Sequence, residues 1–179
     1  MQEKYEVQFI PLQSEHFPLL LKWLETFHVK EWWDSDIHWN LDLIIEKYGS
    51  YVEGYKLERG IPRKLSAYII VYQNKPIGYI QLYNAKDFAR EDHLNLSQYP
   101  SPLAAIDFYI GEKDYLGKNL GALSMQAFLK KHVDPFYTAC LVDPEIENTH
   151  AIKAYQKAGF KIVDKHDNIL IFLRSRTEI

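Results

Sequence analysis

Apolar and polar positions in the first half of the chain alternate with the period of β-strands. In residues 6–12, apolar side chains alternate with polar or opposite-face neighbours, as in a half-buried strand. Residues 65–72 and 77–83 are rich in β-branched and aromatic residues, which favour strands. The turn-forming segment 73–76 separates these two runs, so they are expected to form a hairpin.

Four other segments predict α-helices. Residues 14–24 and 40–51 carry apolar side chains on one helical face, and Ser14 is expected to cap the first helix. Residues 117–132 and 148–158 predict two further helices in the second half of the chain. The residues expected to face inward in the first two helices are Phe17, Leu20, Leu21, Leu24, Leu41, Ile44, Ile45 and Tyr48.

Short apolar segments predict the remaining strands. They cover residues 104–110, 138–142, 160–164 and 169–174, whereas residues 84–103 have no clear period. Strands and helices therefore follow one another along the chain. This order predicts an α/β domain with a mixed central sheet of roughly seven strands and roughly four helices.

The composition is typical of a folded globular protein. Hydrophobic residues make up 47% of the chain and charged residues 25%, which excludes a disordered chain, a collagen-like chain and a coiled-coil rod. The sequence has no linker, internal repeat or low-complexity segment. We therefore expect a single domain spanning residues 1–179.

Charge and cysteine content argue against several classes of partner. The net charge is −3 and the basic residues are scattered, so neither a nucleic-acid surface nor a polybasic membrane surface is expected. The longest nearly apolar run, residues 65–72, is too short to span a bilayer, and the N-terminal sequence does not resemble a signal peptide. Cys140 is the only cysteine, so no internal disulfide can form, which fits the cytoplasm. The histidines are dispersed and no metal-ligand motif is present, so no metal is expected.

The first segment with chemical content is a strand followed by a glycine-bearing turn and a helix. The strand 104–110 leads into the run Leu116-Gly117-Lys118-Asn119-Leu120-Gly121-Ala122. Such a turn directs free backbone N–H groups and the positive end of the helix dipole towards one point. Small residues there let a phosphate approach the backbone. Taken alone, however, the segment is also compatible with an ordinary strand-to-helix turn.

The second segment follows the strand 138–142. It begins with Asp143-Pro144, places Asn148 at a helix start and Tyr155 seven residues later, and ends with Gly159-Phe160. An amphipathic helix with an asparagine cap and a packed tyrosine would look the same. The order and spacing of the two segments together are more specific than either segment alone.

Together the two segments resemble the acyl-CoA-binding core of the Gcn5-related N-acetyltransferase (GNAT) superfamily. Residues 116–122 are similar to its pyrophosphate-binding turn, and residues 143–160 to its Asn-to-Gly-Phe signature. Within that superfamily the chain resembles aminoglycoside 6'-N-acetyltransferases, through additional matches at residues 28–33, 76–83 and 106–107. The resemblance implies a mostly antiparallel sheet with a V-shaped splay.

The resemblance also implies that acetyl-CoA is the acyl donor and lies between two parallel strands that splay apart, residues 104–110 and 138–142. Asn119 stands where the family usually has glycine, but asparagine tolerates left-handed backbone better than most residues. The residues implied to bind the cofactor are Phe108, Tyr109, Ile110, Leu116, Gly117, Lys118, Asn119, Leu120, Gly121, Ala122, Asn148, Ala151 and Tyr155.

Two residues are implied to be catalytic. Asp107 would accept the proton of the attacking amine, or would only bind a cationic acceptor, and the sequence leaves both roles open. An aspartate inside an apolar strand is costly to bury without a partner, which favours a functional role. Tyr155 would protonate the departing thiolate, although a tyrosine that only packs remains the alternative.

The acceptor is expected to be a small-molecule amine. Residues 31–36 combine two tryptophan rings with three carboxylates, which suits a sugar-like polycation, although one of the two rings is expected to pack in the core. The residues proposed to contact the acceptor are Trp32, Trp33, Asp34, Gln81, Tyr83, Asp107, Asp143 and Glu145.

The sequence leaves three functions open. The first is acetyl transfer to the 6'-amine of aminoglycosides, and the second is acylation of another amine or hydroxylamine, such as a siderophore precursor or small metabolite. Residues 97–105 lack the acidic residue that the aminoglycoside enzymes tend to carry there, which keeps the second function open. The third is a non-catalytic acyl-CoA-binding module. The sequence does not distinguish a monomer from a homodimer.

Overall fold

A central eight-stranded sheet organises the computed structural model, which describes residues 6–92 and 94–176. The strand order is β1-β3-β4-β5-β6-β8-β7, with β2 paired to β3. The strands are β1 (Gln8–Pro11), β2 (Tyr55–Glu58), β3 (Ile61–Tyr72), β4 (Lys75–Asn84), β5 (Leu103–Ile110), β6 (Ala139–Val142), β7 (Lys161–His166) and β8 (Ile169–Ser175). The α-helices are α1 (Phe17–Leu24), α2 (Phe27–Lys30), α3 (Leu41–Val52), α4 (Leu120–Phe128) and α5 (Thr149–Lys157).

The predicted mixed, mostly antiparallel sheet is confirmed. Among the strands of the described residues, β5 and β6 are the only parallel neighbours, and β3 and β4 form the predicted hairpin. The described part of the chain has one strand and one α-helix more than the sequence predicted. The additional strand β2 and the additional helix α2 have only four residues each, so neither shows a recognisable period.

Three expectations about helix ends and faces were wrong. Ser14 does not cap α1, because residues 14–16 form a 3₁₀ turn and the helix begins at Phe17. Leu41 and Ile45 of α3 are 45% and 48% exposed. The buried face of this helix is formed instead by Ile44 and two aromatic rings. The predicted helix at residue 117 begins only at Leu120. The residues that pack inward in α1 and α3 are Phe17, Leu20, Trp23, Leu24, Ile44, Tyr48 and Tyr51.

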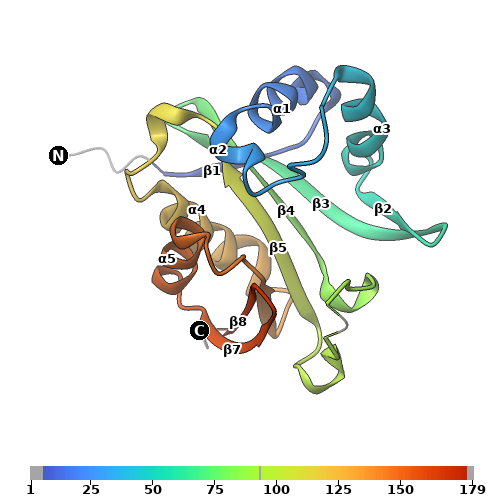
Figure 1. The fold of residues 1–179 in the computed structure, drawn as a ribbon, viewed down its shortest axis with the longest axis vertical. Helices are drawn as coiled ribbons and strands as arrows, with labels where there is room; N and C mark the ends of the chain where they lie inside the picture. Colours follow the sequence, from blue (N-terminus) through green and yellow to red (C-terminus); the bar gives the residue numbers. More distant parts are fainter. Residues whose placement is uncertain (1–5, 93, 177–179) are drawn as a thin grey trace.

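The two faces of the sheet support separate cores. Successive side chains of a strand point to opposite faces, so Ile80 and Ile106 join the core beneath α4 and α5, whereas Tyr79 and Tyr109 join the core beneath α1 and α3. Figure 1 shows α1 and α3 on one side of β5, with α4 and α5 on the other. Strand β5 thus separates two layers of helices and contributes to both cores.

The sheet opens between β5 and β6. Their parallel pairing covers three residue pairs and ends at Ala105 and Leu141. Beyond this point β5 continues to Ile110, bonded to β4 along its other edge, whereas β6 ends at Val142 and the chain turns at Pro144. The predicted splay between these two strands is therefore present, and among the described residues it leaves one edge of β5 without a neighbouring strand beyond Ala105.

The close packing of β4 against β5 gives a test of the fold. A Cβ atom added to Gly78 would lie 2.3 Å from the carbonyl oxygen of Tyr109 and 3.1 Å from the Cα of Ile110. Both are backbone atoms, so β5 would have to move. We expect Gly78→Ala to lower the free energy of unfolding by about 2 kcal/mol, measured by denaturant titration.

Gly49→Ala is the matched control for this prediction. Gly49 lies within α3, and an added Cβ would meet no atom within 4 Å. Alanine has the higher helix propensity, so this variant should be unchanged or more stable by up to about 1 kcal/mol. Equal stability of the two variants would contradict the close approach of β4 and β5.

Candidate active site

A cavity of about 740 Å³ occupies the opening beside β5. It brings together the end of β5, the turn before α4, and the segment from Asp143 through α5. His28, Val29, Glu31, Trp32 and Trp33, from the other layer of helices, also line it. The two segments that the sequence singled out therefore line one continuous space.

The turn before α4 has left-handed backbone at two positions. Gly117 and Asn119 have positive φ angles of 72° and 62°, so asparagine adopts the left-handed conformation expected of it. The Oδ1 atom of Asn119 accepts a hydrogen bond of 2.8 Å from the Nζ of Lys157, which joins the start of α4 to the end of α5. The first N–H groups of α4, which begins at Leu120, have no partner within the helix.

Helix α5 and its cap place three of the predicted residues, Asn148, Ala151 and Tyr155, along the cavity. Asn148 caps the helix, because its Oδ1 accepts a hydrogen bond of 3.2 Å from the N–H of Ala151. This bond uses the carbonyl oxygen of the side chain and leaves its NH₂ group available to donate. The cap explains why the helix begins at this point.

Tyr155 lies where α5 packs against β5. Its ring contacts those of Phe108 and Phe160, with centroids 5.8 and 5.6 Å apart, and only 6% of the residue is exposed. Burial raises the pKa of Tyr155 well above its usual value, and the charges of Asp107 and Asp143 raise it further. The phenol therefore keeps its proton at neutral pH.

A chain of hydrogen bonds from residues of β4 orients the carboxylate of Asp107. Asp107 lies directly opposite Gln81 in the β4–β5 pairing and accepts a bond of 2.9 Å from the Gln81 Nε2. The hydroxyl of Tyr79 donates to the Oε1 of Gln81 over 2.7 Å, which fixes the orientation of the amide. Burial raises the pKa of Asp107, while hydrogen bonds from Gln81 and Tyr83 partly oppose this shift.

Asp107 and Tyr155 approach the cavity from opposite faces of the sheet. Asp107 shares its face with Tyr79 and the α1–α3 layer, whereas Tyr155 packs on Phe108, which belongs to the α4–α5 layer. Both residues line the same cavity because the splay of β5 from β6 connects the two faces. One space is thus accessible to a proton acceptor from one layer and a proton donor from the other.

The predicted acceptor residues fall into three groups. Trp32, Trp33, Asp107, Asp143 and Glu145 line the cavity. Gln81 and Tyr83 are not among the lining residues and instead support Asp107 from behind.

Asp34 is also absent from the cavity lining. Its carboxylate forms an ion pair of 2.7 Å with Lys47, whose Nζ also lies 5.4 Å from the ring centroids of Trp39 and Tyr48. Trp33 packs edge-on against Tyr109 at 4.9 Å, so it is the tryptophan of the pair that contacts the core.

All but one of the residues predicted to bind the cofactor line the cavity, and the exception is Lys118, whose Nζ lies over the ring of Tyr115. The sequence analysis missed His28, Lys153 and Lys157, which also line the cavity. The Nε2 of His28 bonds to the Ile110 carbonyl over 2.9 Å. The two lysines are four residues apart on α5, a helical spacing that could have identified them.

Two classes of feature are absent from the described residues. Over residues 6–92 and 94–176, no group of three or more potential metal ligands is present. Within the same part of the chain, no helix has the length and apolar character needed to cross a membrane.

Comparison with known proteins places the chain among acetyltransferases. Residues 13–168 match the family model described as an acetyltransferase (GNAT) domain. The aminoglycoside N(6')-acetyltransferases type 1 of Klebsiella pneumoniae and Serratia marcescens are each 29% identical over 153 residues, which cover 84% of this chain and 72% of those proteins.

Solved structures of aminoglycoside acetyltransferases are also similar to this chain. AAC(6')-Ib in complex with ribostamycin and coenzyme A has a TM-score of 0.78 and 26% identity, over 96% of this chain and 94% of that one. AAC(6')-Ib with coenzyme A and kanamycin gives a TM-score of 0.77, with 26% identity over 96% and 95% of the two chains. The aminoglycoside N(6')-acetyltransferase of Legionella pneumophila, 21% identical with a TM-score of 0.69 over 97% and 94%, supports the fold alone. Since the family model spans most of its length, the chain belongs to the GNAT family of acetyltransferases.

Proposed function

We propose that this protein transfers the acetyl group of acetyl-CoA directly to a primary amine, and that the 6'-amine of an aminoglycoside is one acceptor. The observation that carries the proposal is the single cavity that joins the turn before α4 to Asp107. The similarity to enzymes named aminoglycoside N(6')-acetyltransferases supports the choice of acceptor.

The donor would bind along the open edge of β5. Beyond Ala105, no strand of the described residues lies beside this edge, so the backbone of residues 108–110 would pair with the pantetheine arm as a strand does. The exception is the Ile110 carbonyl, which already bonds to the Nε2 of His28. The free N–H groups at the start of α4 would hold the pyrophosphate, with the helix dipole adding to the attraction. The side-chain NH₂ of Asn148 would donate to the arm near the thioester.

The reaction would begin with removal of a proton from the acceptor. An amine is mostly protonated at neutral pH and must lose a proton before its nitrogen can attack. Asp107 would accept that proton, and its raised pKa makes it a better base than an exposed aspartate. As the new C–N bond forms and the C–S bond breaks, negative charge develops on sulfur. Tyr155, which keeps its proton, would donate it to that sulfur. The nitrogen loses its second proton as it becomes an amide, and that proton would restore the Tyr155 phenol, while Asp107 would release the first proton to solvent.

The first prediction concerns the reaction itself. We expect thiol release from acetyl-CoA to depend on added kanamycin or tobramycin, with acetyl-CoA alone as the control. Release only with other amines would reject the aminoglycoside assignment and retain the transferase. Binding of acetyl-CoA without thiol release for any amine would contradict catalysis.

The second prediction concerns Asp107. We expect Asp107→Asn to lower kcat/KM for the acceptor by at least about 100-fold, because asparagine cannot take up a proton. The affinity for acetyl-CoA should not change. In the unmodified protein, kcat/KM should fall as the pH is lowered through the raised pKa of Asp107, since only the carboxylate acts as a base.

Glu46→Gln is the control for this prediction, because Glu46 is an exposed carboxylate on α3 outside the cavity. Its pH profile should match that of the unmodified protein. An Asp107→Asn variant with an unchanged rate and pH profile would reject Asp107 as the base.

The third prediction concerns Tyr155. We expect Tyr155→Phe to lower kcat by about 10-fold to 100-fold, because the ring packing stays but the proton donor is lost. The dissociation constant for acetyl-CoA, measured by calorimetry, should stay within about twofold. Tyr55→Phe, in β2 and away from the cavity, is the control. Loss of acetyl-CoA affinity with kcat retained would assign Tyr155 to binding alone.

A further inference from the structure

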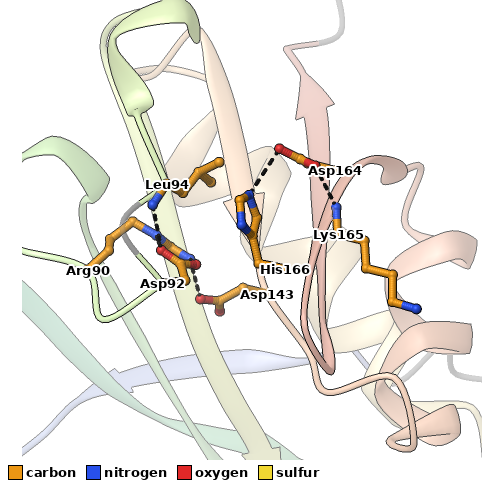
Figure 2. A network of polar contacts seen from close by, with 7 residues as sticks. All are labelled: Arg90, Asp92, Leu94, Asp143, Asp164, Lys165 and His166. Atoms are coloured by element: carbon orange, nitrogen blue, oxygen red, sulfur yellow. Dashed lines mark hydrogen bonds and ion pairs between the residues drawn. The ribbon is translucent and has the colours of Figure 1, made fainter.

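Arg90 forms a partly buried ion-pair network with Asp92 and with Asp143, which lines the cavity. It lies in the segment between β4 and β5, and its side chain is only 15% exposed. Its Nη2 donates to the Oδ2 of Asp143 over 2.9 Å, at the end of β6. Its Nε and Nη2 also bond the two oxygens of Asp92 over 3.0 and 2.5 Å, as Figure 2 shows.

The carboxylate that Arg90 contacts belongs to the cavity. Asp143 lines it, together with Asp107. Burial raises the pKa of Asp143 to about 6, the charge of Asp107 adds to this rise, and Arg90 opposes it. Two carboxylates that line one cavity disfavour each other's charge, and the ion pair with Arg90 compensates the charge of Asp143.

We propose that Arg90 determines the acceptor specificity by occupying the carboxylate that a second ammonium group of the acceptor would bind. This inference rests on the proposed function, in which the reacting amine goes to Asp107. An acceptor with one amine leaves the pair between Arg90 and Asp143 intact. A polycationic acceptor gains the charge of Asp143 only by displacing Arg90.

Asp92 makes this displacement feasible. It holds the guanidinium by two hydrogen bonds, and Arg90 is the leading cause of the lowered pKa of Asp92. When Arg90 leaves Asp143 it therefore still has an ion-pair partner. A lone buried charge, which would be far more costly, is not created.

Asp34 is a second carboxylate that already has a cation from the chain. Lys47 pairs with it over 2.7 Å. The carboxylates that the sequence suggested for a polycation are thus partly neutralised before any acceptor binds. The arrangement favours amines of low charge over amines of high charge.

The experiment compares the binding of two acceptors to the protein loaded with coenzyme A, by calorimetry. One acceptor is kanamycin, which has several amines, and the other is 6-amino-6-deoxyglucose, which has one. We expect Arg90→Gln to bind kanamycin about fivefold or more tightly than the unmodified protein, while binding of the monoamine changes by less than about twofold. In the double variant Arg90→Gln/Asp143→Asn, this increase in the affinity for kanamycin should disappear.

Two further variants keep the test specific. Arg59→Gln removes the same charge from a side chain that is 84% exposed and outside the network, so the affinity for kanamycin should not change. Asp92→Asn leaves Arg90 with Asp143 as its remaining partner in the network, so kanamycin should bind more weakly. Thermal unfolding of each variant checks that the fold is retained.

The outcomes separate this inference from the proposed function. Kanamycin binding to Arg90→Gln that is no tighter than to Arg59→Gln overturns the role of Arg90. If kanamycin binds none of these variants, the inference is rejected together with the aminoglycoside acceptor, whereas thiol release with a monoamine would still uphold acetyl transfer. Tighter binding without any thiol release supports the role of Arg90 and rejects the proposed reaction.

Discussion

The early end of the β5–β6 pairing is the constraint on which the site depends. Three residue pairs join the two strands, and β5 then continues alone along one edge. A full parallel pairing would fill that edge with hydrogen bonds and close the cavity. The splay also explains how Asp107 and Tyr155, which belong to opposite layers, line the same space. The antiparallel partner β4 makes the opening possible, because it pairs with β5 from Ala104 to Ile110.

The second constraint is the burial of charge. Asp107 and Asp143 line the same cavity, and partial burial raises the pKa of both. The protein responds differently at the two positions. Neutral donors, Gln81 and Tyr83, support Asp107, so its carboxylate has no ion-pair partner among the described residues. A charged donor, Arg90, is placed on Asp143. Asp107 is therefore suited to exchanging a proton, whereas Asp143 is suited to remaining an anion.

The sequence predicted the order of elements and the position of the site better than it predicted details of packing. The β3–β4 hairpin and the strand-turn-helix before α4 follow from local periods and turn residues, and Asn119 adopts the backbone conformation expected of it. The face of α3 was partly wrong at Leu41 and Ile45, because the buried face is set by the aromatic packing of Tyr48 and Tyr51, which no local period reveals. The four-residue elements α2 and β2 are defined by their neighbours in space. A sequence does not show which atoms a side chain bonds, so it could not distinguish Asn148 as a helix cap from Asn148 as a cofactor ligand. In the structure the cap uses the side-chain oxygen and leaves the NH₂ group for a cofactor.

Counting carboxylates along the sequence overstates the negative charge that an acceptor meets. Three acidic residues within residues 31–36, followed by Asp143 and Glu145, suggest a site for a polycation. Partners from distant segments change that picture, since Lys47 and Arg90 pair with Asp34 and Asp143. Charge complementarity depends on which carboxylates lack a cation after folding, because an ion pair within the protein competes directly with a charged ligand. Shared catalytic geometry within a family therefore does not fix the preferred acceptor, because residues outside the reacting centre, on a segment with no regular period, set the charge of the acceptor site.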